Sequence, residues 1–215
     1  MSLTVLGDFT RKLDRRRGAC ALIAIKERSR CKTRLAGALP PLARAQLVRS
    51  MLAKVLSAAD AAETVRQIIV VSPERDCISA QIPVLADTGE CLNGALIEAH
   101  RVLRDFGSRE VVILPADLPT ITAADIDALV RAAEGGGFAL AADTAGVGTN
   151  AMCLVSAQPF RFQFGSDSKR LHMQEAERMG LRAQLVCLPG LEFDVDSPAD
   201  LHRLDRQQWL ARHQA

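Results

Sequence analysis

The chain is poor in aromatic residues: its 215 positions include one tryptophan, seven phenylalanines and no tyrosine. Proteins that bind single-stranded nucleic acid usually stack bases on aromatic side chains, so this class is disfavoured. The 27 lysines and arginines nearly balance the 25 aspartates and glutamates, so the charge indicates no extended basic surface. We therefore expect no nucleic-acid partner.

Long apolar runs and paired cysteines are also missing. No apolar segment reaches the length of a membrane span, and the polar, basic stretch up to Arg17 has no secretory apolar region. The six cysteines form no Cys-x-x-Cys pair, which argues against a structural zinc site and against a disulfide framework. We expect a cytoplasmic protein without a membrane partner.

What the chain does have is enough apolar content, 48%, for a full core. Its length suits one domain over residues 19–215, preceded by a flexible arm at 1–18. Strand-like and helix-like patterns alternate, which predicts an α/β fold with three layers and a mostly parallel sheet. The expected strands are 19–25, 67–71, 82–85, 111–114, 138–142, 151–155 and 184–188, and the expected helices are 41–59, 92–103, 122–133, 168–179 and 197–210.

The most informative segment is Val-Val-Ile-Leu-Pro-Ala-Asp-Leu-Pro at 111–119. Its apolar residues predict a buried strand that ends at Pro115, with Asp117 just beyond the carboxyl end. Ligands of open α/β sheets bind at that edge. Asp117 is therefore a candidate ligand for a hard cation that also contacts a nucleotide phosphate, although aspartate is also common in turns.

A second acidic loop, Phe-Asp-Val-Asp-Ser-Pro-Ala-Asp-Leu, occupies 193–201. Ser197 and the proline after it predict a helix start. Asp196 is then either a metal ligand or a capping residue, and Asp194 is either a second ligand or faces solvent. Together with Asp117 these carboxylates suit Mg²⁺.

A basic loop follows the first strand, with five lysines or arginines among residues 26–35. Lys26, Lys32 and Arg34 could bind a triphosphate and stabilise departing pyrophosphate. The alternative is a solvated loop, because both the P-loop and the Gly-x-Gly-x-x-Gly patterns are absent. The two acidic loops and the basic loop together favour a metal-dependent nucleotidyltransferase.

Three further segments carry hydrogen-bonding groups near expected turns. Asn93 could bind a base or ribose through its amide, or could cap a helix. The glycine turn at 146–151 includes Thr149 and Asn150 and is either an anion cradle or a plain hairpin connection. Residues 164–168 open a helix where Ser166 and Ser168 could bind an acceptor phosphate, or Ser168 could simply cap the helix. The four histidines have no ligand spacing, and His172, one turn into that helix, is the one to watch.

These motifs, taken in order, resemble a known family. They are Ala-Ile-Lys at 24–26, Lys-Thr-Arg-Leu at 32–35, Leu-Asn-Gly-Ala at 92–95, Pro-Ala-Asp-Leu-Pro at 115–119, Gly-Thr-Asn-Ala at 148–151, Phe-Gly-Ser at 164–166 and the acidic loop at 193–201. The chain is similar over about residues 20–205 to the guanylyltransferases of coenzyme F420 biosynthesis, the CofC/FbiD family.

The resemblance implies a GT-A-type, Rossmann-like fold and transfer of GMP from GTP to a small phospho-carboxylate. The family's acceptors are 2-phospho-L-lactate, phosphoenolpyruvate and 3-phospho-D-glycerate. By similarity, Asp117 and Asp196 would hold Mg²⁺, the three basic residues would hold the triphosphate and Asn93 would lie near the nucleoside. Residues near the acceptor would be Thr149, Asn150, Gly165, Ser166 and Ser168.

Departures from the family pattern cluster around the expected acceptor pocket. Glu90 and Cys91 stand where glycines are usual, and Ser166-Asp167 replaces a common Pro-Gly. A more polar pocket would favour 3-phospho-D-glycerate. The rivals are a molybdenum-cofactor-type guanylyl- or cytidylyltransferase, which would usually carry a glycine-rich first loop, and a non-catalytic nucleotide-binding protein. A homodimer is left open.

Overall fold

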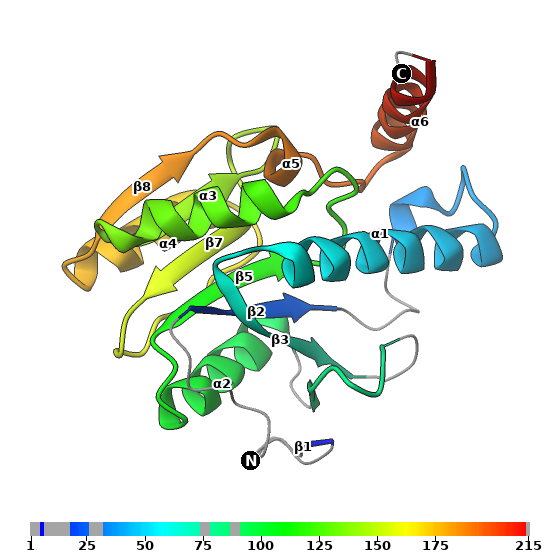
Figure 1. Ribbon diagram of the computed structural model, residues 1–215. Helices are drawn as coiled ribbons and strands as arrows, with labels where there is room; N and C mark the ends of the chain where they lie inside the picture. Colours follow the sequence, from blue (N-terminus) through cyan, green and yellow to red (C-terminus); the bar gives the residue numbers. More distant parts are fainter. Residues whose placement is uncertain (1–4, 7–17, 26–31, 74–77, 87–90, 214–215) are drawn as a thin grey trace.

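The computed structural model describes residues 5–6, 18–25, 32–73, 78–86 and 91–213. Within them a single sheet is covered by helices on both faces, as the alternating pattern predicts (Figure 1). The strands are β1 Val5–Leu6, β2 Ala19–Ala24, β3 Val65–Ser72, β4 Val84–Ala86, β5 Glu110–Pro115, β6 Gly137–Ala142, β7 Thr149–Val155 and β8 Arg182–Val186. The helices are α1 Pro41–Ala61, α2 Leu92–Asp105, α3 Ala123–Glu134, α4 Ser168–Arg178, α5 Pro189–Glu192 and α6 Pro198–His213, with the 3₁₀ helix η3 at Thr33–Leu35.

The strand order is β1-β4-β3-β2-β5-β7-β6-β8. Four of the seven pairings are parallel, which include both pairings of β2. Strand β7 runs antiparallel between β5 and β6, with Ile113 opposite Met152. The start of β7 therefore lies at the same edge of the sheet as the carboxyl ends of β2 and β5.

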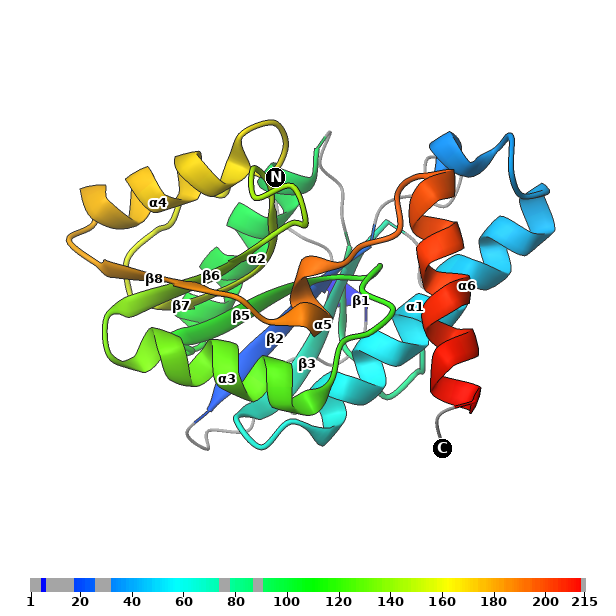
Figure 2. The same cartoon turned by 90° about the horizontal axis from the view of Figure 1, so that it is seen from above.

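The two faces of the sheet bury alternate residues of each central strand. In β2, Ala21 and Ile23 join a core cluster with α1 and α3, whereas Cys20 and Leu22 join a cluster with α2 and α4. Figure 2, seen from above, shows the sheet between these two helix layers. A strand buried on both faces reads as a continuous apolar run, which is why the sequence predicts β2 and β5 well.

A third, smaller cluster lies beside α1. Leu35 of η3, Met51 of α1 and Leu204 of α6 pack there against Phe193 and Val195. Helix α6 extends away from the sheet next to this cluster (Figures 1 and 2). The cluster thus holds η3 and the acidic 193–196 segment against the same helix, α1.

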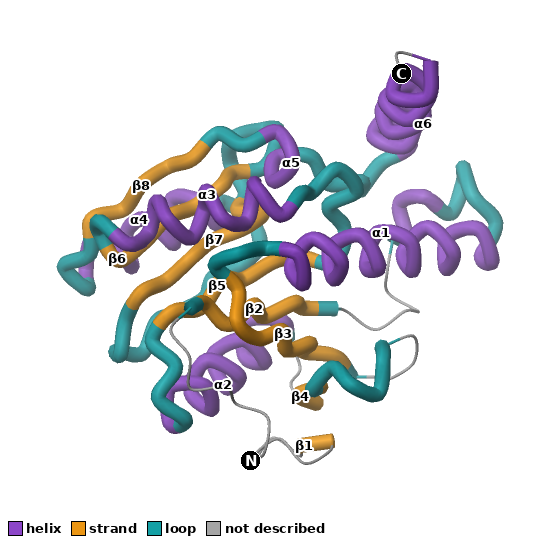
Figure 3. Tube along the Cα trace, in the orientation of Figure 1, coloured by secondary structure: helices purple, strands orange, loops and turns teal. Residues whose placement is uncertain are grey.

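Several details differ from the sequence-based prediction. The arm expected at 1–18 includes β1, which pairs with β4 as the trace in Figure 3 shows, and its other residues up to position 17 lie outside the described part. Pro115 does not stop β5 but pairs opposite Ala24, because a proline at a strand end removes only one N–H donor. No helix among the described residues has the length and apolarity that crossing a membrane requires.

Candidate active site

A cavity of about 340 Å³ opens at the carboxyl ends of β2 and β5. Its apolar wall comes from α1, α2 and β5, and its polar wall from η3 and from the turns that follow β5 and precede α6. The lining residues include Ile25, Lys32, Arg34, Val48, Met51, Leu92, Leu96, Ile113, Asp117, Thr149, Asn150, Phe164 and Asp196. The cavity lies where an open α/β sheet is expected to bind its ligand.

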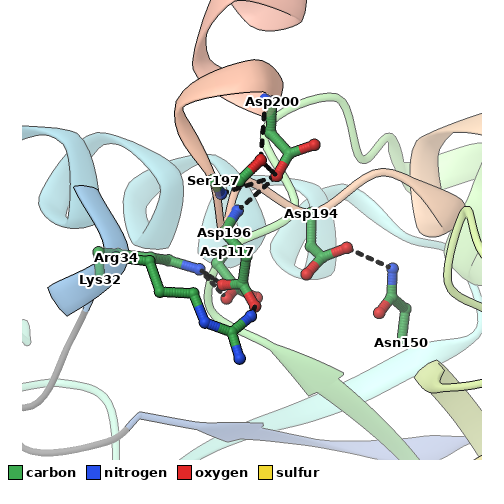
Figure 4. A network of polar contacts seen from close by, with 8 residues as sticks. All are labelled: Lys32, Arg34, Asp117, Asn150, Asp194, Asp196, Ser197 and Asp200. Atoms are coloured by element: carbon green, nitrogen blue, oxygen red, sulfur yellow. Dashed lines mark hydrogen bonds and ion pairs between the residues drawn. The ribbon is translucent and has the colours of Figure 1, made fainter. Parts of the chain in front are cut away.

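Three carboxylates lie close together, two of them in the polar wall of the cavity. Asp117, Asp194 and Asp196 each offer an oxygen, and these oxygens all lie within 4.8 Å of one another. Asp117 lies in the turn after β5, whereas the other two alternate with Phe193 and Val195, whose side chains are buried. Because alternate residues of an extended segment point to opposite sides, burying the apolar pair turns both carboxylates toward Asp117 (Figure 4).

Lys32 lies between two of these carboxylates. Its Nζ is 2.5 Å from Asp117 Oδ2 and 2.7 Å from Asp196 Oδ1, and only 7% of its side chain is exposed. Burial alone would lower the pKa of Lys32, but the neighbouring Asp117 and Asp196 raise it above its ordinary value. Arg34, 79% exposed, places its guanidinium 4.0 Å from Asp196. Two of the three cationic side chains predicted for phosphate binding, Lys32 and Arg34, therefore face the carboxylates.

The backbone of Lys32 adopts the left-handed conformation, with φ 54° and ψ 38°. Residues other than glycine rarely do so, since the side chain crowds the following carbonyl. The next residues form η3, which Leu35 anchors in the small core cluster. The strained turn and this anchor together direct Lys32 into the cavity.

Asp194 is a half-buried carboxylate whose pKa is shifted by its surroundings. Burial raises its pKa, and the like charges of Asp117 and Asp196 raise it further. The amide Nδ2 of Asn150 donates to Asp194 at 3.4 Å and to the carbonyl of Glu192 at 3.0 Å. Asn150 thus connects the start of β7 to the acidic segment.

The three carboxylates form a donor set that fits a divalent cation. Mg²⁺ prefers a few carboxylate oxygens together with phosphate and water oxygens. The ammonium of Lys32, bridging Asp117 and Asp196, shows that a cation is accommodated between them. Asp194, which the sequence left as ligand or surface residue, has an oxygen close to those of the other two.

The carboxylate of Asp200 fixes the main chain that carries Asp196. Asp200 Oδ2 accepts hydrogen bonds from the N–H groups of Asp196 and Ser197 at 3.1 and 2.7 Å, and the Ser197 hydroxyl accepts from Asp200 N at 3.3 Å. This reciprocal pair is a capping box at the start of α6, where the sequence predicts a helix start at Ser197 but not the box itself. Asp200 thus caps α6 and also fixes the backbone of the site residue Asp196.

The predicted acceptor residues fall into two groups. Thr149 and Asn150 line the cavity, whereas Gly165, Ser166 and Ser168 do not. Gly165 and Ser166 are exposed, and the buried Ser168 accepts a hydrogen bond from Thr149 N at 2.8 Å. Asp167, not Ser168, is the N-cap of α4. Ser168 therefore contacts the pocket through Thr149.

The side chain of Asn93 makes hydrogen bonds to the backbone of Phe164, which the sequence did not predict. Its Nδ2 donates to the carbonyl of Phe164 at 3.0 Å, and its Oδ1 accepts from Phe164 N at 2.7 Å. Both sides of the amide thus hold the backbone of a residue that lines the cavity. The role beside the nucleoside stays a prediction, and the geometry gives Asn93 a loop-fixing contact. No local signal could have revealed a partner 71 positions away.

His172 is a buried polar residue beside the pocket. Its Nδ1 lies 3.0 Å from Thr149 Oγ1, and Gln163 N donates to its Nε2 at 2.8 Å. Burial lowers its pKa to about 4, with the nearby Glu175 acting in the opposite direction. The sequence singled out this histidine only by its place in the helix.

Lys26, the remaining predicted phosphate-binding residue, lies outside the described residues.

Two solved structures with the same fold are named as nucleotide-handling enzymes. A candidate nucleotide-diphospho-sugar transferase from Desulfovibrio desulfuricans G20 matches with a TM-score of 0.74 and 17% identity, covering 88% of this chain and 87% of that one. A 4-diphosphocytidyl-2C-methyl-D-erythritol synthase matches with a TM-score of 0.62 and 13% identity, over 90% and 100% of the two chains. These likenesses establish the nucleotidyltransferase fold.

Sequence relatives are more specific. The phosphoenolpyruvate guanylyltransferase of Rubrobacter xylanophilus is 37% identical over 190 residues, which cover 86% of this chain and 92% of the relative. The phosphoenolpyruvate guanylyltransferase of Sphaerobacter thermophilus is 38% identical over 188 residues, covering 86% and 91%. The model of the family described as guanylyl transferase CofC-like matches residues 19–205. A nucleotidyltransferase fold, a carboxylate cluster facing basic side chains and the match over residues 19–205 agree: the chain belongs to the CofC-like guanylyltransferase family.

Proposed function

We propose that this protein transfers GMP from GTP to a phosphorylated three-carbon acid and releases pyrophosphate. The observation that carries the proposal is the cluster of three carboxylates, Asp117, Asp194 and Asp196, with Lys32 beside it at the edge of the sheet. The chain that carries this cluster is about 37% identical to a phosphoenolpyruvate guanylyltransferase. The reaction joins an oxygen of the acceptor's phosphate to the α-phosphorus of GTP. The bond between the α-phosphorus and the bridging oxygen breaks, and that oxygen leaves with the pyrophosphate.

The three carboxylates would hold Mg²⁺. A bound magnesium ion supplies neutralisation of phosphate charge. No general base is needed, because the attacking phosphate oxygen is already ionised at neutral pH. What the chain contributes is therefore orientation and charge rather than proton transfer.

Cationic side chains bind the departing pyrophosphate in this proposal. Arg34 is exposed at the cavity mouth, and Lys32 presents an ammonium at its polar wall. Positive charge placed where the pyrophosphate develops its own negative charge stabilises the transition state more than the ground state. Lys26, by its place in the same loop, is proposed to add to this charge.

The acceptor is proposed to bind beside Thr149 and Asn150, which line the cavity next to the carboxylates. The names of the relatives put phosphoenolpyruvate first among the three candidate acids. The preference for 3-phospho-D-glycerate, based on the departures from the family pattern, gains no support from them. All three acids therefore belong in the test.

The test incubates the protein with GTP, Mg²⁺ and each phospho-acid separately, and measures pyrophosphate and product mass. We expect a guanosine diphospho-adduct with at least one acid. A folded protein that binds GTP but yields no adduct with any acid would contradict the proposal. Replacing GTP with CTP in the same assay separates this activity from that of a cytidylyltransferase.

A further inference from the structure

The hydrogen bonds of the buried His172 ring fix which of its nitrogens carries the hydrogen. A backbone N–H can only donate, so the Nε2 that faces Gln163 N at 2.8 Å is an acceptor and holds no hydrogen. The ring is fully buried, and its pKa of about 4 keeps it neutral at physiological pH. A neutral imidazole without hydrogen on Nε2 has it on Nδ1.

This tautomer determines the direction of the next hydrogen bond. Nδ1–H of His172 donates to Thr149 Oγ1, 3.0 Å away. A hydroxyl that accepts a hydrogen bond from one side still has its own hydrogen to donate elsewhere. Thr149 lines the cavity, and its backbone N–H is already used by Ser168 Oγ. The hydroxyl is therefore the donor that Thr149 can offer to a ligand.

We propose that His172 is a positioning residue for the acceptor acid, which holds the Thr149 hydroxyl so that it donates to an anionic oxygen of that acid. The inference rests on the proposed function, since it takes the anion at Thr149 to be the phospho-acid. Were Nε2 protonated instead, Nδ1 would accept from the threonine and the hydroxyl would have no hydrogen for an anion.

The surroundings of His172 support a fixed ring rather than a mobile one. Its ring packs edge-on against Phe164, with centroids 4.8 Å apart, and Phe164 is itself held on both backbone groups by Asn93. The charged group that faces it, Glu175 on the same helix, is paired with Arg178 at 2.7 Å. The ring thus connects the start of β7 to the 163–164 wall of the cavity.

Two substitutions separate the two hydrogen bonds of the ring. In His172→Asn, the side-chain amide nitrogen can take the place of Nδ1 and keep the donor to Thr149. In His172→Gln, the amide oxygen can take the place of Nε2 and keep the acceptor for Gln163 N, while the donor to Thr149 is lost. His100→Gln is the matched control, because His100 is also buried and packs edge-on against a phenylalanine, Phe162, away from the residues that line the cavity.

Steady-state kinetics with phosphoenolpyruvate and GTP varied in turn give the first readout. We expect His172→Gln to raise KM for the acid about tenfold with KM for GTP unchanged, as for loss of one hydrogen bond to a charged group. In His172→Asn and in His100→Gln, KM for the acid should stay within about threefold of the wild-type value. Thr149→Val should match His172→Gln, and combining the two should add nothing further.

An unchanged KM for the acid in His172→Gln, or equal rises in both KM values, would overturn the inference. The second readout needs neither turnover nor a variant: ¹⁵N NMR of the wild-type histidine rings identifies the protonated nitrogen of His172. We expect hydrogen on Nδ1 from pH 6 to 8, and hydrogen on Nε2 would overturn the inference. Failure of the proposed function would look different, because the wild type would then form no adduct with any acid.

Discussion

At the scale of single residues, Lys32 lies between two of the three carboxylates that we propose as metal ligands. Its ammonium contacts Asp117 and Asp196, and its side chain is 7% exposed. Replacing Lys32 with alanine leaves the three carboxylates without this counter-charge, so we expect Mn²⁺ to bind the nucleotide-free protein roughly tenfold more tightly. Electron paramagnetic resonance of free Mn²⁺ measures this affinity.

Arg34→Ala is the control for the lysine substitution. The Arg34 side chain is 79% exposed and 4.0 Å from Asp196, so solvent screens its contribution. We expect its removal to change Mn²⁺ affinity by less than about threefold. Equal effects of the two substitutions would mean that general charge, and not the position of Lys32, sets metal affinity.

Residues with local signals were predictable from sequence, and residues with distant partners were not. Asp117 follows a buried strand, and the alternation of Asp194 and Asp196 with apolar neighbours places both carboxylates on one side. Asn93 instead holds Phe164 across 71 positions, and His172 reaches Thr149 across 23. Such contacts depend on how the chain folds back, which residue types and spacing do not encode locally.

At the scale of elements, the first turn of α6 both starts a helix and holds a site residue. Asp200 accepts from the N–H groups of Asp196 and Ser197. We expect Asp200→Ala to lower the free energy of unfolding by about 1 kcal/mol, as for loss of a cap, and to lower turnover as well, because Asp196 loses its fixed backbone. Chemical denaturation and the pyrophosphate assay measure the two effects.

Helix α3 offers a matched control, since it begins with the same kind of capping box between Thr122 and Asp125. Asp125→Ala should cost a similar amount of stability, again about 1 kcal/mol, and leave turnover unchanged. If both variants lost activity equally, the effect of Asp200 would be one of stability alone.

Long elements were predictable because their apolar periodicity extends over many residues. The helix expected at 41–59 is α1, Pro41–Ala61, and the helix expected at 122–133 is α3, Ala123–Glu134. The short elements β1, η3 and α5 were missed, because two to four residues carry no measurable period. Their existence depends on tertiary pairing, as with β1 against β4.

At the scale of the whole molecule, two buried histidines connect stability to pH. Burial lowers the pKa of both His100 and His172 to about 4 from an ordinary 6.5. Between these values the unfolded rings bind protons that the folded rings do not, so stability falls as the pH drops from 6.5 toward 4. Between pH 6.5 and 4, each ring lowers the free energy of unfolding by roughly 3 kcal/mol. Urea denaturation between pH 7 and pH 5 measures the slope.

The double variant His100→Gln/His172→Gln isolates this effect. Carboxyl groups with lowered pKa, such as Asp127 and Glu175, lose their contribution only below their ordinary values of 3.8 and 4.5. The pKa values of Asp194 and Glu110 are raised, so these two groups make stability fall as the pH rises, which is opposite to the effect of the histidines. The slope above pH 5 should therefore become flatter in the double variant, and an unchanged slope would rule out the histidines as its cause.

The sheet as a whole brings the site together. Two parallel strands, β2 and β5, end at the edge where the antiparallel β7 begins, so Lys32, Asp117 and Thr149 line the same cavity. The α/β class follows from the alternating pattern, but the reversed direction of β7 does not. Its orientation is set by pairing with β5 and β6, and without it Thr149 and Asn150 would lie at the opposite edge.

The most direct test of this account is the turnover of Asp117→Asn. The substitution keeps the size of the side chain and removes the charge that faces Lys32 and the other two carboxylates. We expect guanylyl transfer from GTP to the phospho-acid to fall at least about a hundredfold, with the circular dichroism spectrum unchanged. A folded Asp117→Asn protein that transfers GMP at the wild-type rate would contradict the central claim.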